Sequence, residues 1–327
     1  MMVRMVVAFG EQTTRYFDRR HIGVPTAVPL GPAAWRAADV ADSRRWMVHL
    51  GDSQIAELED AYAAAVGSGR RMSGLASSDF ELLSLAEEIA AWGKEVSDGR
   101  GFVVIRGFPV ERWGIAQTEY IYWAIGQHLG RPGAQNPKGD LLGHVVDHRD
   151  SGDLDAVRAY RTARFIGYHC DGADVVGLLC LVNSARGGLS RIVSSVSVFA
   201  ELLHSHPELA ARMCEPFALD LRHDTDDVKH LQVRPVCHDG RSVRTFFDSD
   251  CFRSADRHES IEFDPIDIAA LDAWEEIANR PEMYLEMDLK PGDMQLLSNH
   301  TIAHARTAYE DVPDGPKRHL LRLWLTV

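Results

Sequence analysis

Two side chains near the middle of the chain have the types and the spacing of metal ligands. His169 and Asp171 are separated by one residue, and in a β-strand such residues point to the same face. With a second histidine they would leave three positions open on one metal, which is the arrangement of iron(II) oxygenases. The pattern alone is weak evidence in a chain with 15 histidines, and His148 and Asp150 match it too.

A second histidine is available in a C-terminal block that runs from Pro291 to Leu325. The block opens with Pro-Gly-Asp, continues through Asn299, and closes with an apolar run that contains arginines. It holds two candidate ligands, His300 and His304, which share the same parity along an extended strand. The direction in which their side chains face therefore does not decide between them.

This block resembles the taurine dioxygenase-like group (TauD/TfdA) of 2-oxoglutarate oxygenases. In that family a Pro-Gly-Asp turn, a strand, an asparagine, the distal iron histidine and an arginine-rich closing strand follow one another. The resemblance extends from about Gly101 to the end of the chain. It implies that His169, Asp171 and His304 hold the iron, because the residues after His304 match those that the family places after its metal histidine.

The resemblance also implies how the cosubstrate binds. Arg318 and Arg322 fall where the family keeps two arginines, four residues apart on the closing strand. A planar guanidinium group can hold a carboxylate by two parallel hydrogen bonds. We expect Arg318 to bind 2-oxoglutarate and Arg322 to serve the cosubstrate or the substrate. Ser190, in a Gly-Gly-x-Ser element, is expected to bind the same carboxylate, although the two glycines also fit a simple turn.

The activity that the resemblance implies is that of a 2-oxoglutarate-dependent non-haem iron dioxygenase, which uses Fe(II), 2-oxoglutarate and O2. Hydroxylation of an unactivated C–H bond is the default outcome, and desaturation and ring closure are variants. Halogenation is not expected, because such halogenases replace the carboxylate ligand that Asp171 supplies. Substrate contacts are expected around Gln135–Gly143, after Asp171 and in Phe246–Arg257. Arginines and aromatic residues there favour a small, carboxylate-bearing or amino-acid-like substrate, as in specialised metabolism.

Three other readings of the same residues are open. A cupin-type metal enzyme that does not use 2-oxoglutarate would not need the arginine pair. A non-catalytic jelly-roll binding protein would be expected to have lost a metal ligand. Zinc-dependent hydrolases of the HExxH type place their histidines on a helix rather than on a strand.

Composition limits the setting of this chemistry. The 327 residues are 45% hydrophobic and 25% charged, which is ordinary for a globular protein. The net charge of −13 disfavours binding to nucleic acid or to anionic membranes, and no apolar run reaches the roughly 20 residues that span a bilayer. Five cysteines without a CxxC pair indicate a reduced, cytoplasmic setting. The family includes monomers, dimers and tetramers, so a homo-oligomer is compatible with the sequence.

The elements that must position the site residues form a β-rich pattern. From residue 133 onward, short apolar runs alternate with Gly, Asp and Pro, which is typical of a β-sandwich or jelly roll. Strands are expected at 101–107, 141–146, 165–168, 175–182, 191–195, 243–247, 284–289, 294–297 and 319–327. Helices are expected at about 52–66, 78–92, 115–129, 198–213 and 264–279, the first capped by Asp52 or Ser53 and the second by Ser78 or Asp79.

The sequence therefore predicts a mixed α/β, β-rich fold with a double-stranded β-helix (jelly roll) core and flanking helices. Residues 101–327 are expected to form the oxygenase domain. Residues 1–100 are expected to form a helical and irregular extension packed on that core, so that the whole chain is one structural unit. Within the extension, residues 11–50 lack periodicity and are expected to be irregular chain.

Overall fold

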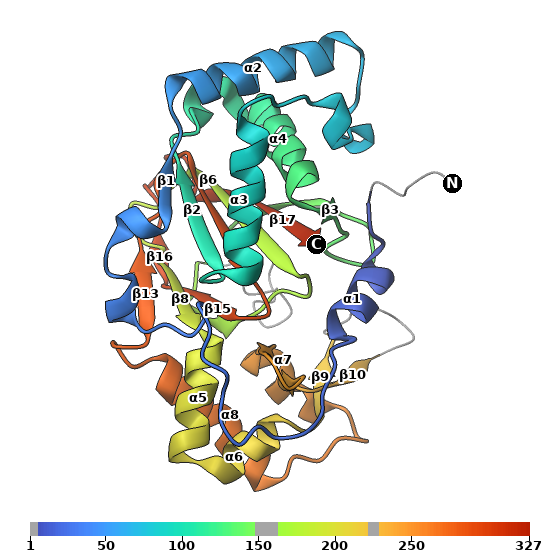
Figure 1. The fold of residues 1–327 in the computed structure, drawn as a ribbon, viewed down its shortest axis with the longest axis vertical. Helices are drawn as coiled ribbons and strands as arrows, with labels where there is room; N and C mark the ends of the chain where they lie inside the picture. Colours follow the sequence, from blue (N-terminus) through green and yellow to red (C-terminus); the bar gives the residue numbers. More distant parts are fainter. Residues whose placement is uncertain (1–5, 148–162, 222–228) are drawn as a thin grey trace.

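The computed structural model describes residues 6–147, 163–221 and 229–327 (Figure 1). The α-helices in these ranges are α1 (Phe9–Phe17), α2 (Asp52–Gly67), α3 (Leu85–Asp98), α4 (Val110–Leu129), α5 (Ser195–Ser205), α6 (Pro207–Met213), α7 (Ser249–Arg253) and α8 (Pro265–Ala278). Short 3₁₀ turns lie at Ala37–Val40, Ser43–Arg45, Met72–Gly74, Ser77–Asp79 and Ser254–Arg257. No helix in the described ranges is long and apolar enough to cross a membrane.

Two β-sheets form the centre of the molecule. The larger sheet has the strand order β1 (Met47–His49), β2 (Phe102–Arg106), β14 (Asp293–Ser298), β6 (Val175–Val182), β17 (His319–Thr326) and β3 (Arg131–Pro132), and β4 (Leu142–Val146) also pairs with β17. The smaller sheet has the order β13 (Tyr284–Met287), β8 (Ser190–Ser194), β15 (Ile302–Arg306) and β5 (Ile166–His169). Two-stranded pairs are formed by β9 (Phe217–Asp220) with β10 (His230–Val233), β11 (Val236–His238) with β12 (Val243–Thr245), and β7 (Arg186–Gly187) with β16 (Tyr309–Glu310).

Strand β17 shows how the sequence divides the core into layers. Its odd-numbered leucines, Leu321, Leu323 and Leu325, belong to the apolar cluster formed with α3 and α4. Its even-numbered residues Leu320 and Trp324 belong to a second cluster, which joins the larger sheet to residues of β8, β13 and β15. Because alternate residues of a strand face opposite sides, one apolar strand fills both layers, and its even positions face the space between the sheets.

Helices cover the outside of this pair of sheets. In Figure 1, α2, α3 and α4 lie together over the larger sheet, and α5, α6 and α8 form a separate group below the smaller one. Together with the two sheets, this arrangement confirms the predicted β-rich fold with a jelly-roll core and flanking helices. Strand β1 pairs in parallel with β2 of the core sheet. The division of the chain at residue 100 stays a prediction.

The strand predictions agree with the structure to within a few residues. The prediction of irregular chain and short turns over residues 11–50 is confirmed for residues 18–46, which contain two 3₁₀ turns, and is wrong at both ends, where α1 and β1 lie. Helix α2 begins at Asp52, as expected, but its N-cap is Gly51. Helix α3 begins at Leu85 rather than at Ser78 or Asp79, because residues 77–79 form a separate 3₁₀ turn.

Two further helices differ from their predicted limits. Helix α4 begins at Val110, five residues before the predicted start, and its backbone is interrupted at Gly114, where φ is +69°. The single helix predicted over 198–213 is two helices, α5 and α6, which meet at His206. His206 precedes Pro207, and the residue before a proline is disfavoured in the helical region. The helix predicted over 264–279 is confirmed as α8, with Asp264 as its N-cap.

Candidate active site

The two strands that carry the predicted metal ligands lie side by side. His169 ends β5 and His304 lies on β15, and the two residues are register partners in the antiparallel pair. Their ring centroids are 4.1 Å apart. Asp171 lies two residues after the end of β5, and its Oδ2 atom lies 3.8 Å from Nε2 of His304. The fold therefore brings together the three side chains that the sequence analysis selected, from segments more than 130 residues apart.

Contacts with the backbone and with neighbouring side chains orient these groups. Nδ1 of His169 lies 3.0 Å from the carbonyl oxygen of Gly167. Because a carbonyl oxygen only accepts hydrogen bonds, the proton is on Nδ1, and the lone pair of Nε2 is available to a metal ion. The backbone N–H of Asp171 donates to Oδ1 of Asn299 at 3.1 Å. The side chain of Asn299 also donates to the carbonyl oxygen of Ala173 at 2.9 Å. Asn299 is fully buried, so it holds the turn after β5 against the end of β14.

The protonation states suit a divalent cation. Burial, followed by the proximity of His169, lowers the pKa of His304 from 6.5 to about 3, so its ring is neutral at pH 7. Burial would raise the pKa of Asp171, but Arg322, followed by the two histidines, outweighs burial and holds this pKa below its ordinary value. Oδ2 of Asp171 is buried without a hydrogen-bond partner among the described residues. A neutral imidazole of His304 beside an ionised carboxylate oxygen fits the donor set that Fe(II) prefers.

The three-residue ligand set nevertheless stays a prediction. Among the residues that the structure describes, no group of three or more His, Cys, Asp or Glu side chains is close enough together to hold a metal ion as it stands. The proposed ligand set therefore rests on the approach of the His169 ring to the His304 ring and of Asp171 Oδ2 to His304 Nε2. The other His-x-Asp pair, His148 and Asp150, lies outside the described residues.

The rival histidine, His300, is engaged elsewhere. It lies in the turn between β14 and β15 rather than on β15, so the strand parity that it shares with His304 in the sequence does not apply. Its Nε2 atom lies 2.9 Å from Oδ1 of Asp174, and its ring stacks on Tyr16 at a centroid distance of 4.9 Å. These contacts favour His304 as the candidate ligand.

The predicted cosubstrate residues lie at another part of the space between the sheets. Arg318, just before β17, is buried, and its Nη2 atom lies 3.5 Å from the carbonyl oxygen of Gly188. Ser190 is also buried, and its hydroxyl donates to Oε1 of Gln295 at 3.0 Å. The structure thus places Arg318 against the Gly-Gly-x-Ser element, as the resemblance implied.

The two glycines of this element are needed for conformational reasons. Gly187 and Gly188 have φ values of +70° and +69°, which side chains rarely tolerate. A Cβ atom on Gly187 would lie 2.1 Å from the carbonyl oxygen of Ala308. A Cβ atom on Gly188 would lie 3.0 Å from Nε of Arg318. The element is therefore a tight turn, and its tightness brings the arginine close to the backbone.

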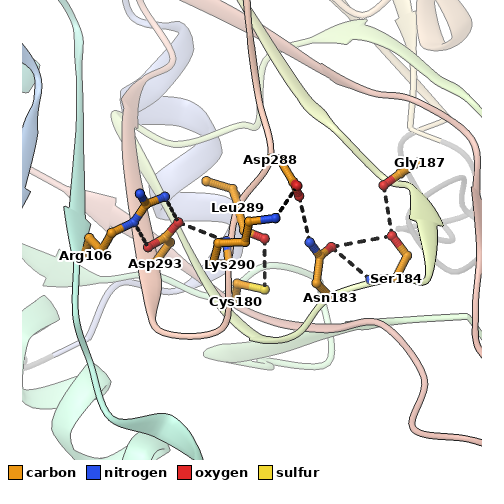
Figure 2. Close-up of polar contacts among 9 residues, drawn as sticks. All are labelled: Arg106, Cys180, Asn183, Ser184, Gly187, Asp288, Leu289, Lys290 and Asp293. Atoms are coloured by element: carbon orange, nitrogen blue, oxygen red, sulfur yellow. Dashed lines mark hydrogen bonds and ion pairs between the residues drawn. The ribbon is translucent and has the colours of Figure 1, made fainter.

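The Pro-Gly-Asp turn before β14 is fixed by a polar network shown in Figure 2. The buried carboxylate of Asp293 accepts two hydrogen bonds of 2.7 Å from Arg106 of β2 and a third, of 2.9 Å, from the backbone N–H of Lys290. Asp288 interacts with Lys290 and accepts a hydrogen bond from Asn183. The network anchors the start of β14 and reaches the segment that precedes the Gly-Gly element.

The second arginine of the predicted pair, Arg322, lies at the metal-ligand end. Its Nη1 atom lies 3.2 Å from Oδ1 of Asp171, and its Nε donates to Oε1 of Gln135 at 2.8 Å. Gln135 in turn donates to the carbonyl oxygens of Leu141 and Arg322. Arg322 therefore orients the candidate carboxylate ligand, which distinguishes its surroundings from those of Arg318.

One buried arginine in this region did not emerge from the sequence analysis as a site residue. Arg306 lies on β15, and its guanidinium carbon is 4.6 Å from the ring centroid of Tyr309, over which Arg318 also lies at 5.2 Å. Burial, followed by the charge of Arg318, lowers the pKa of Arg306 to about 10. The signal was its spacing, because residues 304 and 306 face the same side of a strand.

A cavity of about 210 Å³ opens beside His169 and Asp171. Its wall includes three side chains of α1, the side chain of Gln135, and residues at the start of α7: Phe9, Thr13, Phe17, Phe246, Asp248 and Asp250. Gln135, Gly172 and part of 246–257 thus face the cavity, as predicted. The contribution of α1 was not predicted from the sequence.

Of the arginines that were expected near the substrate, Arg322 lines this cavity, whereas Arg253 does not. Arg253 donates to Asp272 and Glu275 at 2.6 and 3.1 Å. Arg244 belongs to a separate surface pocket. Cys170, between the two proposed ligands, is buried with its pKa raised to about 12 by burial, and Trp274 stacks on a core phenylalanine. The acidic residues 224–227 lie outside the described part of the chain.

The chain is similar in sequence to several known proteins. The family model described as "Taurine catabolism dioxygenase TauD, TfdA family" matches residues 68–324. FR-33289 synthase of Streptomyces rubellomurinus is 31% identical over 307 residues, which cover 91% of this chain and 90% of that protein. The taurine hydroxylase-like protein SAT17 of Stachybotrys chartarum is 24% identical over 317 residues, covering 93% and 81%.

Solved structures share the fold. Asparagine oxygenase, in complex with Fe(II), 3-hydroxyasparagine and succinate, has a TM-score of 0.69 at 18% identity and covers 86% of this chain and 94% of that one. The non-haem iron oxygenase OrfP, in complex with Fe and α-ketoglutaric acid, has a TM-score of 0.62 at 15% identity, with the same coverage. Because the family model spans most of the chain, the protein belongs to the TauD/TfdA family and is a dioxygenase that depends on Fe(II), 2-oxoglutarate and O2, as the sequence predicted.

Proposed function

We propose that the protein hydroxylates an unactivated C–H bond of a small, amino-acid-like molecule, with Fe(II) bound by His169, Asp171 and His304. The observation that carries this proposal is the register of β5 and β15, which sets His169 beside His304 with Asp171 next to them. When bound, the iron and 2-oxoglutarate supply the oxidising power, while the protein supplies geometry and binding. Arg322 keeps the carboxylate ligand ionised and oriented through its contact of 3.2 Å.

Arg318, with Ser190, is proposed to bind the far carboxylate of 2-oxoglutarate. Arg318 is buried, and its Nε atom has no hydrogen-bond partner among the described residues. A buried guanidinium group with an unpartnered N–H gains from a bound anion, and Arg306 lies over the same Tyr309 ring as Arg318. Arg306 is therefore added to the proposed cosubstrate site. Arg322 fits this role less well, because it already contacts Asp171 and Gln135.

The chemical class of the substrate is proposed from the relatives and from the cavity. Structures similar to this chain include asparagine oxygenase with 3-hydroxyasparagine and OrfP with (3S)-hydroxy-L-arginine. In this chain, Asp248 and Asp250 line the cavity next to His169, and carboxylates at this position can accept hydrogen bonds from the ammonium group of an amino acid. The substrate is therefore proposed to be an amino-acid-like molecule of specialised metabolism, and the enzyme is proposed to be cytoplasmic.

The test begins with anaerobic titration of the metal-free protein with Fe(II) and 2-oxoglutarate, followed by visible absorption. The wild type should develop the weak charge-transfer band of an iron–2-oxo acid chelate. His304→Ala should abolish the band, and Arg318→Ala should require far more 2-oxoglutarate to develop it while Fe(II) still binds. Arg186→Ala is the matched control, because Arg186 is an exposed arginine on neighbouring β7. A normal band in both His304→Ala and Arg318→Ala would refute the assignments.

The substrate class needs a separate assay. The wild type, loaded with Fe(II), is given 2-oxoglutarate, O2 and a panel of the standard L-amino acids and their N-acyl derivatives. Succinate release above the level without added compound, together with a product heavier by one oxygen atom, would identify a substrate. Absence of stimulation across the panel, with the charge-transfer band intact, would refute the amino-acid class alone.

A further inference from the structure

Helix α1 contributes one side of the active-site cavity although it lies outside the residues that the family model matches. The model covers residues 68–324, whereas α1 spans Phe9–Phe17. Phe9, Thr13 and Phe17 all line the cavity beside the candidate iron ligands. They are spaced by four residues, so they form one stripe along the helix. Figure 1 shows α1 near α7 and β9, which supply other parts of the cavity wall.

A second stripe of the same helix ties it to the active site. Gln12 and Tyr16, four residues apart, are the buried residues of α1. The side-chain amide of Gln12 donates to the carbonyl oxygen of Ala134 at 3.0 Å, next to Gln135. The hydroxyl of Tyr16 donates to the carbonyl oxygen of Asn299 at 2.9 Å. The helix is thus held both to the segment that contacts Arg322 and to the residue that positions Asp171.

The end of the chain supplies a third attachment. Nη2 of Arg15 donates to the carbonyl oxygen of Val327 at 2.8 Å, and the backbone N–H of Val327 donates to Asp174. A helix of nine residues without a side-chain N-cap has little stability of its own. The position of α1 therefore comes from its hydrogen bonds to the rest of the fold. These hydrogen bonds are made by Gln12, Arg15 and Tyr16 rather than by the cavity-facing side chains. That stripe can change without altering the residues proposed for the metal and the cosubstrate.

We propose that the cavity-facing stripe of α1, formed by Phe9, Thr13 and Phe17, determines which substrates the enzyme accepts. Phe17 packs edge-on against Phe246 at 4.9 Å, so an aromatic surface faces the cavity from this side. The carboxylates at the start of α7 line another part of it. The ligand class is a molecule with an apolar part, which contacts α1, and a cationic group. This inference rests on the proposed function and deepens it.

Two adjacent threonines provide a matched test. Thr13 lines the cavity, whereas Thr14 is exposed to solvent. Thr13→Trp should fill part of the cavity, and Thr14→Trp should leave it open at similar cost to the helix. We expect Thr13→Trp to lower kcat/KM for substrates of the amino-acid panel by at least about tenfold, most for the bulkiest ones. Thr14→Trp should stay within about twofold of the wild type.

Two further measurements separate specificity from general damage. The charge-transfer band with Fe(II) and 2-oxoglutarate should persist in both threonine variants, which tests metal and cosubstrate binding separately from substrate turnover. Phe17→Ala should enlarge the cavity and shift the preference toward bulkier panel members, and Thr13→Leu is a milder variant should Thr13→Trp fold poorly. Equal kinetics in the Thr13 and Thr14 variants would overturn the proposal. Loss of the band in Thr13→Trp alone would also overturn it, because α1 would then act on the metal site.

The same experiments distinguish failure of the proposed function. A wild type without the band contradicts the metal and cosubstrate assignments. If the wild type shows the band but no panel member stimulates its succinate release, the proposal of an amino-acid-like substrate is contradicted. In that case a crystal structure of Thr13→Trp with Fe(II) and 2-oxoglutarate decides on α1. An indole ring inside the cavity supports the proposed role, and a ring in solvent or a displaced helix refutes it.

Discussion

Replacement of Asn299 by alanine should weaken both the fold and the metal site. The Asn299 side chain is fully buried and makes two hydrogen bonds, one from the backbone N–H of Asp171 at 3.1 Å and one to the carbonyl oxygen of Ala173 at 2.9 Å. Alanine leaves both backbone groups buried without their side-chain partner. Each such group costs about 1 to 3 kcal/mol, so the free energy of unfolding should fall by about 2 to 6 kcal/mol.

The effect on metal binding follows from the same geometry. The backbone of Asp171 is held at the angle at which Oδ2 approaches His304, and loss of that hydrogen bond lets the turn move. Groups that orient a metal ligand in this way typically change metal affinity by about 10- to 100-fold. We expect Asn299→Ala to bind Fe(II) more weakly within that range.

Both quantities can be measured on the purified protein. Urea unfolding of the metal-free form, followed by tryptophan fluorescence, gives the stability change, and anaerobic Fe(II) titration gives the affinity. Asn279→Ala is the control, because its exposed side chain makes a single hydrogen bond to a backbone carbonyl at the end of α8, and it should cost less than about 0.5 kcal/mol. A loss in Asn299→Ala no greater than in this control, with unchanged Fe(II) affinity, would refute the role of Asn299.

Three other predictions concern the surrounding structure. Gly177→Ala should lower stability by about 1 to 3 kcal/mol in urea unfolding, because the new Cβ atom would lie 2.6 Å from the hydroxyl of buried Tyr122. Asp293→Asn should cost about 1 to 3 kcal/mol, less than a fully buried pair, because the Arg106 side chain is 36% exposed; an unchanged midpoint would contradict the network in Figure 2. Iodoacetamide should modify partly exposed Cys251 first, as seen by peptide mass spectrometry, because burial raises the thiol pKa of three other cysteines to about 12.

The strands of the core were predictable because their signal is local. Strands β6 and β17 are almost continuous apolar runs bounded by polar or turn residues, as expected for strands buried on both faces. The break between α5 and α6 also had a local signal, since His206 precedes a proline. The prediction of a single helix over 198–213 was wrong because it gave more weight to the spacing of apolar residues than to this proline.

Helix α1 could not be predicted in the same way. Its sequence contains Gly10, Thr13 and Thr14, which are weak helix formers. The helix exists because Gln12 and Tyr16 find partners more than 120 residues away in the sequence. The helix is amphipathic, but this local pattern does not show which part of the fold it packs on, so the cavity wall that α1 supplies emerged only from the three-dimensional structure.

Strand alternation accounts for part of the candidate site, whereas the choice of His304 over His300 came from the resemblance to the family, and the residue assignments stay a prediction. The even positions of β17 and the residue before it face the space between the sheets, which places Arg318 and Arg322 there together. The same rule applied to β15 would have selected Arg306 as well as His304. Strand alternation does not apply to His300, because this residue lies in a turn rather than in a strand.

The charges around the cavity favour a cationic substrate over an anionic one. Asp171 is paired with Arg322, and Asp220 with Arg257, each at 3.2 Å or less. Asp248 and Asp250 have no ion pair within the part of the chain that the structure describes. Because unpaired carboxylates attract cations and repel anions in a partly enclosed space, the negative end of an amino-acid-like substrate is expected to point away from α7. An ammonium group at α7 and an apolar part against α1 satisfy both walls at once.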